Sequence, residues 1–241
     1  MAEIRVGTSG WSYRHWHGPF YPEGVARSHE LEYYVTVFDT VEINGTFYGT
    51  PSKRAVEGWY QTAPEGFLYA VKGNRYITHN LKLNDPADAV QRMRAVIEPL
   101  GDKCGPILWQ FGRNFSAHID RLANYLKLRA PAERWAFEFR HESWFRDEVY
   151  QVLADHNCAL VWADTPHYPL HLQVTADWLY CRLHGHEVLY VSAYDDRQLG
   201  WWQAQLHQAS AGERDIFVYF DNDAMGRAPR DALRLREMLA D

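Results

Sequence analysis

Short apolar runs recur at intervals along the whole chain. They are rich in β-branched and aromatic residues and show little alternation with polar residues, which is typical of strands buried on both faces of a parallel sheet. The sequence therefore predicts eight strands, at Ile4–Thr8, Phe38–Ile43, Phe67–Lys72, Pro106–Gln110, Trp135–Phe139, Leu160–Asp164, Leu179–Leu183 and Ile216–Phe220.

Segments with apolar residues three and four positions apart separate most of these runs and predict amphipathic helices. The gap between the sixth and seventh strands, Thr165–Asp177, contains Pro166 and Pro169, and proline disrupts the interior of a helix. We therefore expect the helix between these two strands to be missing or vestigial. The predicted helices span Ser28–Val37, Ser52–Gln61, Pro86–Leu100, Ala117–Leu128, Ser143–His156, Ala193–Ala209 and Pro229–Leu239.

This alternation of strands and helices predicts an α/β fold with a parallel sheet. Eight strand and helix units favour a closed barrel over an open doubly wound sheet, and the 241 residues agree with the size of about 250 that such barrels have as single domains. No low-complexity linker or run of like charges divides the chain. The expected architecture is a (β/α)₈ TIM-barrel-like fold in which residues 1–241 form a single domain.

The charge of the chain narrows the classes of partner. The formal net charge is −6, whereas general binding to nucleic acid requires clustered, uncompensated lysine and arginine. The start of the chain lacks the charged and apolar regions of a signal peptide, and nowhere are there 18 consecutive apolar residues. We therefore expect a cytoplasmic protein with no membrane partner and no general nucleic-acid surface.

Polar and ionisable residues end or follow nearly every predicted strand. This is the end at which (β/α)₈ barrels build their active sites from the loops after the strands. Several charged residues there lie within or beside apolar runs, where an isolated charge is costly unless it is paired and hydrogen-bonded. The pattern predicts a polar pocket at the mouth of the barrel, with a structural layer of ion pairs as the alternative. These charged residues are Glu42, Lys72, Glu138, Arg140 and Arg182.

Four residues are candidates for catalysis at this mouth. Glu42 and Glu138 can form a carboxylate pair whose surroundings separate their pKa values into an acid and a base, as in glycoside hydrolysis. Lys72 can form a Schiff base if its pKa is lowered, or it can pair with a carboxylate or hold a substrate anion. His141, three residues after Glu138, is the fourth candidate.

Other residues near the strand ends are candidates for substrate binding. Guanidinium groups bind carboxylates and phosphates in a bidentate manner, so we expect a small anionic ligand. Aromatic residues near the same loops can form a stacking wall for a sugar or a base. The substrate-binding candidates are Ser9, Trp11, Tyr13, Asn44, Phe47, Arg75, Gln110, Arg140, Trp144, Asp164, Arg182, His184 and Asn222.

The sequence assigns no metal ligands and requires no cofactor. His184-Gly185-His186 and carboxylates such as Asp164 can supply ligands to a divalent metal, which is the alternative, but their spacing is not diagnostic of one. The phosphate-loop, dinucleotide-binding and serine-nucleophile motifs are absent. No feature of the sequence indicates an oligomeric state.

Short motifs extend from the first predicted strand to the last. They are Gly7–Tyr13, Phe20–Pro22, Thr40–Asn44, Thr46–Tyr48, Ala70–Lys72, Arg75–His79, Gly105–Leu108, Glu138–His141, Arg182–Gly185 and Val218–Phe220. With these motifs in this order, the chain resembles the DUF72 (YecE-like) family from end to end. The resemblance implies a TIM-barrel-like fold with the motifs around its mouth, and no settled activity. Asp221 departs from the family pattern, which often has asparagine there, and adds a negative charge.

These observations favour an enzyme that acts on a small anionic or sugar-like metabolite by acid/base chemistry at the mouth of the barrel. Glu42 and Glu138 are the acid/base candidates, and the nearby cations would stabilise charge. Hydrolase, lyase and isomerase chemistry all remain open. The alternative is a non-catalytic protein that binds a phosphorylated ligand or the end of a nucleic acid.

Overall fold

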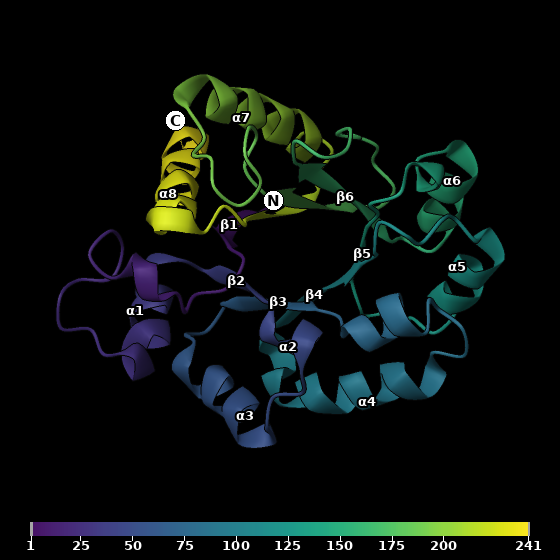
Figure 1. Ribbon diagram of the computed structural model, residues 1–241, viewed down its shortest axis with the longest axis horizontal. Helices are drawn as coiled ribbons and strands as arrows, with labels where there is room; N and C mark the ends of the chain where they lie inside the picture. Colours follow the sequence, from purple (N-terminus) through teal and green to yellow (C-terminus); the bar gives the residue numbers. More distant parts are fainter. Residues whose placement is uncertain (1, 241) are drawn as a thin grey trace.

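The computed structural model describes residues 2–240, so Met1 and Asp241, the two ends of the predicted domain, lie outside the described part of the chain. Eight parallel strands form one sheet that curls into a nearly closed barrel, with helices around it (Figure 1). The strands are β1 (Ile4–Thr8), β2 (Thr40–Ile43), β3 (Leu68–Lys72), β4 (Cys104–Gln110), β5 (Trp135–Glu138), β6 (Ala159–Asp164), β7 (Trp178–Leu183) and β8 (Asp215–Phe220).

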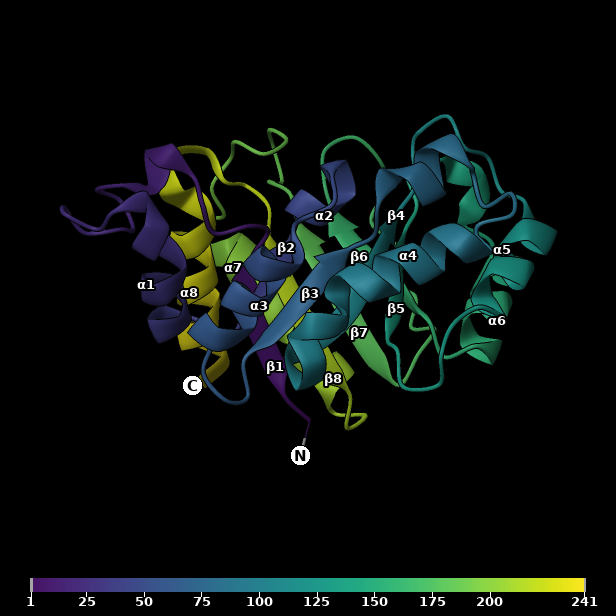
Figure 2. The same ribbon diagram turned by 90° about the horizontal axis from the view of Figure 1, so that it is seen from below.

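The predicted (β/α)₈ TIM-barrel-like fold is confirmed. All eight predicted strands are present, and every boundary lies within two residues of its prediction. Neighbouring strands pair in parallel in the order β1-β8-β7-β6-β5-β4-β3-β2. In Figure 2 the N-terminus lies at the lower end of the barrel, and the loops that follow the strands lie at the upper end, which is the mouth.

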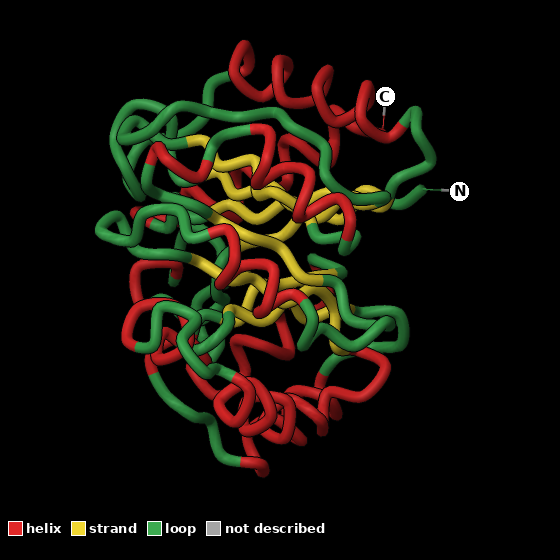
Figure 3. The backbone as a smooth tube through the Cα atoms, turned by 90° about the vertical axis from the view of Figure 1, so that its right-hand side faces the viewer, coloured by secondary structure: helices red, strands yellow, loops and turns green. Residues whose placement is uncertain are grey.

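The helices lie outside the strands (Figure 3). Short helical segments such as α2 (Gly45–Tyr48) and Tyr76–Asn80 escaped prediction because they span too few residues to show a period. None of the helices within residues 2–240 is both long and apolar enough to cross a membrane. The helices are α1 (Glu30–Val37), α2 (Gly45–Tyr48), α3 (Lys53–Thr62), α4 (Ala87–Ile97), α5 (Ile119–Leu126), α6 (Asp147–Asp155), α7 (Asp196–Ser210) and α8 (Arg227–Ala240).

The expected absence of a helix between β6 and β7 is confirmed, since Thr165–Asp177 contains none. This loop instead bonds directly to β6. The Thr175 hydroxyl accepts a hydrogen bond from the Leu160 amide at 2.8 Å and donates one to the Cys158 carbonyl at 2.7 Å. The loop therefore covers part of the outer face of β6 in place of a helix.

Small and large side chains lie on opposite sides of the barrel interior. Alanines from β3, β5 and β6, together with Leu108 and Val161, face four large aromatic residues of β7 and β8. This complementary arrangement fills the interior, as small barrels require. The interior aromatics are Trp178, Tyr180, Phe217 and Tyr219, and the interior alanines are Ala70, Ala136, Ala159 and Ala163.

The barrel closes through an unusually close contact between β1 and β2. The two strands share an isolated bridge between Ser9 and Glu42 instead of a longer ladder. A hydroxyl from α1 joins them lower down, because Tyr34 Oη accepts from the Thr8 amide at 3.0 Å and donates to the Thr40 carbonyl at 3.2 Å. Closure therefore relies on side chains as much as on backbone pairing.

Gly7→Ala is expected to lower the free energy of unfolding by about 1–3 kcal/mol. A Cβ at this position would lie 2.3 Å from the Thr40 carbonyl oxygen, so β1 would have to move away from β2. Gly58→Ala is the matched control, because a Cβ there meets nothing within 4 Å and helix α3 should gain up to about 1 kcal/mol. Urea unfolding measures both, and equal effects would contradict the close contact.

Candidate functional site

A single arginine occupies the centre of the mouth. Trp178 and Tyr180 of β7 face the barrel interior, and Arg182, two residues further, lies on the same side of the strand. Its side chain is fully buried. The predicted charged residues therefore meet inside the barrel, above its aromatic layer.

Three carboxylates surround the Arg182 guanidinium. Glu42 receives a bidentate pair of hydrogen bonds, from Nε at 2.9 Å and from Nη2 at 2.7 Å. Arg182 Nη1 donates to Glu138 at 2.6 Å, and Nη2 donates to Asp221 at 3.1 Å. We call Arg182, Glu42, Glu138 and Asp221 the central network. Its ion pairs compensate charges that burial would otherwise make costly.

Glu42 is fully occupied within the central network. Besides the two bonds from Arg182, it accepts hydrogen bonds from the hydroxyls of Ser9 and Tyr180, the latter at 2.6 Å. A carboxylate offers about four lone-pair positions, so none remains for a substrate. Its side chain is also fully buried. These contacts favour a structural role for Glu42 over the predicted catalytic one.

Glu138 is bound by more partners than any other carboxylate in the mouth. Its Oε1 accepts from Arg140 at 2.8 Å, from Gln110 at 2.9 Å and from the Tyr168 hydroxyl at 3.2 Å. Burial alone would raise its pKa, but the charges of Arg140 and Arg182 outweigh burial and hold the pKa well below its ordinary value. Glu138 is therefore ionised near neutral pH and cannot serve as a proton donor there.

Asp221 and His184 complete the central network on the β8 side. His184 Nδ1 lies 2.8 Å from Asp221 Oδ2, and its Nε2 lies 3.4 Å from Arg182 Nη1. Burial raises the pKa of Asp221, but Arg182 and His184 have the larger combined effect and lower the pKa to about 2. Asp221 is not among the site residues predicted from the sequence, although its position directly after β8 is a signal for it.

Lys72 differs from the other cations of the mouth. Its side chain lies at the end of β3 and is 6% exposed, yet within residues 2–240 it forms no ion pair. Its Nζ lies 4.4 Å from the centre of the Phe47 ring. Burial and then the charge of Arg182 lower its pKa to about 8, against the opposing carboxylates. Lys72 is therefore a cation whose proton can leave near physiological pH.

Arg140 and His79 lie near Lys72. Arg140 binds Glu138 through Nε, and its two Nη atoms make no hydrogen bond within the described chain. Burial, followed by the charges of Arg75, Arg140 and Lys72, lowers the pKa of His79 to about 4. All three cations thus act on one neutral imidazole, so this side of the mouth is electropositive.

A separate group of predicted residues gathers beside β1 and β2. Asn44 donates to the Ser9 hydroxyl at 2.7 Å, and the Tyr13 hydroxyl donates to the Ser9 carbonyl at 2.7 Å. Trp11 packs edge to face on Trp59 at 5.6 Å. Trp11, Tyr13 and Asn44, with neighbouring residues, line a cavity of about 330 Å³. The structure thus brings Ser9, Trp11, Tyr13 and Asn44 together.

Other predicted residues lie away from the central network. His141 bonds Ser143 at 2.9 Å and caps the turn that follows. Trp144 is buried in the core, where it stacks on Phe139 at 4.5 Å. Asn222 donates to Asp231 at 2.8 Å and so anchors the β8 loop to α8. Arg75 is exposed at the start of the Tyr76–Asn80 helix.

The two histidines of His184-Gly185-His186 face different carboxylates. His184 binds Asp221 in the central network, whereas His186 Nδ1 lies 3.0 Å from Asp164 on the outer face of β6. They therefore do not form a shared pair of ligands. Within residues 2–240, no group of three or more histidine, cysteine, aspartate or glutamate side chains is arranged to hold a metal ion.

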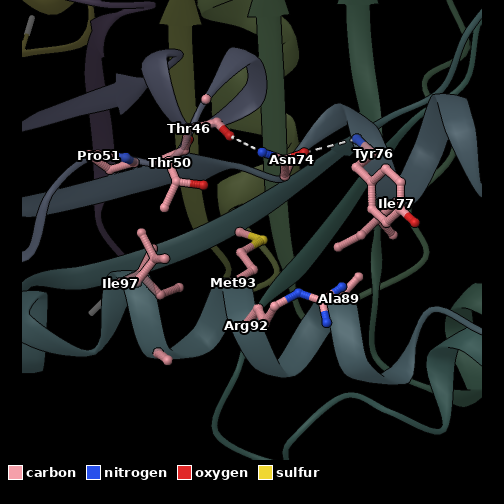
Figure 4. A pocket seen from close by; sticks show the side chains of 13 residues that line it. Thr46, Thr50, Pro51, Asn74, Tyr76, Ile77, Ala89, Arg92, Met93 and Ile97 are labelled. Carbon is pink, nitrogen blue, oxygen red and sulfur yellow. Dashed lines mark hydrogen bonds between the residues drawn. The ribbon is translucent and has the colours of Figure 1, made fainter.

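A cavity of about 470 Å³ lies outside the mouth, between α2, the Tyr76–Asn80 helix and α4 (Figure 4). None of the predicted site residues lines it. Thr46, on its wall, donates to the Lys72 carbonyl at 2.7 Å, and Asn74 donates to the Thr46 carbonyl at 3.0 Å. These bonds fix the backbone at the end of β3 and so help to position Lys72.

Comparison with known proteins adds a relationship over the full length of the chain. A family model described as "Protein of unknown function DUF72" matches residues 5–241. The chain belongs to the DUF72 family. The predicted resemblance is therefore confirmed.

Similar proteins are known from several bacteria. This DUF72 protein is 26% identical to UPF0759 protein YunF of Bacillus subtilis (strain 168). The alignment is 269 residues long, gaps included, and covers 98% of the chain and 94% of YunF. It is 26% identical to UPF0759 protein YecE of Escherichia coli (strain K12) over 152 residues, which cover 62% of the chain and 53% of YecE. The crystal structure of a DUF72 family protein from Thermotoga maritima MSB8 is 30% identical, with a TM-score of 0.90 over 99% of this chain and 100% of that one.

Glu42→Gln is expected to destabilise this DUF72 protein by about 3–5 kcal/mol, because the amide NH₂ of glutamine would face buried N–H and O–H donors that bind the Glu42 carboxylate. Glu57→Gln is the control. Glu57 lies on the surface, 3.9 Å from Lys53, and an exposed pair contributes less than about 1 kcal/mol. Denaturant unfolding of both variants measures the difference. A Glu42→Gln protein as stable as wild type would refute the structural role of the carboxylate.

Asp221 predicts a component of acid denaturation. Because its pKa is lowered from 3.8 to about 2, its stabilising effect is complete above pH 3.8 and is lost as the pH falls through about 2. The shift corresponds to about 2 kcal/mol. Asp221→Asn should therefore be less stable than wild type at pH 7, and the gap should narrow between pH 4 and 2. Urea unfolding across this range tests it, with the exposed Asp102→Asn as control, and a gap that does not change with pH would contradict it.

Proposed function

We propose that this protein is an enzyme that acts on a small anionic or sugar-like metabolite at the mouth of the barrel, with Lys72 transferring the proton. The observation that carries the proposal is the state of Lys72, a nearly buried cation without an ion pair among the described residues and with a pKa of about 8. A general acid or base works best when its pKa lies near the working pH.

The saturation of the carboxylates supports this choice of residue. Glu42 has no free lone pair, and Glu138 is kept ionised by two arginines. Both were sequence candidates for acid/base chemistry, and their contacts favour an electrostatic role instead. Lys72 lies beside this fixed network, where the loss or gain of its proton changes the charge of the mouth.

The free donors of the mouth support an anionic substrate. Arg140 has both Nη atoms available within the described chain, and guanidinium nitrogens bind carboxylate or phosphate oxygens well. Its side chain is 18% exposed, so a ligand can reach it. In the proposed complex, Arg140 binds the anionic group and Lys72 exchanges a proton with a neighbouring carbon or oxygen of the substrate.

The central network would serve such a reaction by staying fixed. Arg182 and its three carboxylates are bound to one another and buried, so they need not reorganise as charge develops on the substrate. When ionised, one arginine and three carboxylates carry a net charge of −2, which the positive charges of Lys72 and Arg140 offset. The substrate anion would then be attracted mainly by Lys72 and Arg140.

Lys72→Gln is expected to lower turnover by about 10²–10⁴-fold on whichever substrate a screen of sugar phosphates, sugar acids and hydroxy acids identifies. The wild-type rate should change near pH 8, where Lys72 gains or loses its proton. Lys72→Arg keeps the positive charge but has a much higher pKa, so its rate should not change near pH 8. Lys53→Gln, on the exposed surface of α3, is the matched control. Steady-state rates between pH 6 and 10 provide the measurement.

Two outcomes would overturn this proposal. The first is a Lys72→Gln protein that retains the wild-type rate, which would remove Lys72 from the reaction. The second is ligand binding that needs Lys72 and Arg140 but gives no turnover, which would favour a non-catalytic phosphate-binding protein. A steep loss of polynucleotide binding with added salt would point to the nucleic-acid alternative.

A further inference from the structure

A cavity of about 520 Å³ lies on the outside of the barrel wall, beside the end of β6 and the start of α7. It occurs where the helix between β6 and β7 is absent, and in Figure 1 only loops lie between α6 and α7. Leu170, from the loop that replaces the helix, forms part of its wall. The missing helix thus leaves room for a ligand.

A buried carboxylate lies in this outer cavity. Val161 and Ala163 of β6 face the barrel interior, so Asp164 faces outward, away from the central network. Asp164 is 5% exposed and accepts a hydrogen bond from Trp202 Nε1 at 3.2 Å. Within residues 2–240, no lysine or arginine pairs with it. Its other partners are the Tyr194 hydroxyl and His186, the latter at 3.0 Å.

His186 presents a hydrogen-bond acceptor at the outer cavity. Because the Asp164 carboxylate accepts a hydrogen bond from Nδ1–H, it favours the tautomer in which Nε2 is unprotonated. Nε2 has no hydrogen-bond partner in the described part of the chain, and the side chain is 56% exposed. The pair can therefore receive a hydrogen bond from a ligand hydroxyl or N–H group.

The rest of the wall combines aromatic surface with a cation. Trp201 is 44% exposed, which is high for so large an apolar side chain, and its ring packs edge to face on Trp202 at 5.2 Å. Arg197, one helical turn earlier on α7, also lines the cavity. Its guanidinium forms no ion pair or hydrogen bond among residues 2–240. An indole face and a free guanidinium suit a flat ring that bears a carboxylate.

We propose that the outer cavity binds a small aromatic carboxylate that also bears a hydroxyl or N–H group. The ring packs on Trp201, the carboxylate binds Arg197, and the hydroxyl or N–H donates to His186, which Asp164 orients. This site lies outside the barrel, so it does not rest on the function proposed for the mouth. His184 and His186 flank one glycine, which places the two sites at either end of a three-residue segment.

Isothermal titration calorimetry with 4-hydroxybenzoate tests the proposal, with benzoate and phenol as probes that each lack one group. Saturable binding of 4-hydroxybenzoate is expected, and each of the simpler probes should bind about tenfold more weakly, because each loses one hydrogen bond to the protein. If 4-hydroxybenzoate does not saturate the protein at millimolar concentration, or if benzoate and phenol bind as tightly as 4-hydroxybenzoate, the proposed ligand class is wrong.

Variants of the full chain assign the contacts. Arg197→Gln should weaken 4-hydroxybenzoate about tenfold but leave phenol unchanged, and His186→Phe should weaken 4-hydroxybenzoate but not benzoate. Trp201→Ala should weaken all three probes. Arg113→Gln, which replaces an exposed arginine elsewhere, and Lys72→Gln, in the mouth, should leave the affinity for all three probes unchanged. If Arg197→Gln behaves like Arg113→Gln, the outer cavity is not the site, and loss of binding in Lys72→Gln would move it to the mouth.

Discussion

The buried charge of Arg182 is the constraint around which the barrel is organised. A guanidinium with no exposed surface must be neutralised and hydrogen-bonded where it lies, because transfer from water into a protein interior is costly. Glu42, Glu138 and Asp221 provide that neutralisation from three different strands or strand ends. The position of one side chain on β7 thereby fixes β2, β5 and β8 relative to one another. Arg182 also contributes to the closure of the barrel. Ser9, directly after β1, forms hydrogen bonds with both Glu42 and Arg182 at the point where β1 and β2 share a single bridge.

This network separates structural from chemical roles among residues of similar type. Charges that satisfy one another completely have little capacity left for a substrate, which applies to Arg182 and Glu42. Lys72 and Arg140 lie at the edge of the network and keep free donors. A fixed arrangement of charges in the floor of the mouth is therefore compatible with proton transfer and ligand binding by the residues beside it. The likeness to the Thermotoga maritima protein extends over nearly the whole chain and fits a barrel whose framework is common to the family.

The outer cavity follows from the same strand geometry. Residues that alternate along β6 face either the barrel interior or the surrounding helices, so Asp164 is directed away from the mouth although it ends a strand. The loop Thr165–Asp177 covers β6 less fully than a helix would, and Trp201 and Trp202 of α7 border the space that remains. Two polar sites with different ligands can therefore arise from neighbouring strand ends.

The sequence by itself determined the barrel, its strands and the missing helix, because hydrophobic periodicity and proline act over short distances along the chain. It also indicated that Glu42, Glu138 and Arg182 meet, since buried charges require partners and strand ends converge at one mouth. Only the tertiary structure decided which of the charged and polar side chains pair with one another. It showed that Glu42 is saturated by Ser9, Tyr180 and Arg182, that Lys72 lacks an ion pair in the described chain, and that Asp164 and His186 face outward. Those facts depend on strand register and on the direction of each side chain. They also depend on contacts between residues far apart in the sequence, such as Glu42 and Arg182, which are 140 positions apart. No local sequence pattern specifies such contacts.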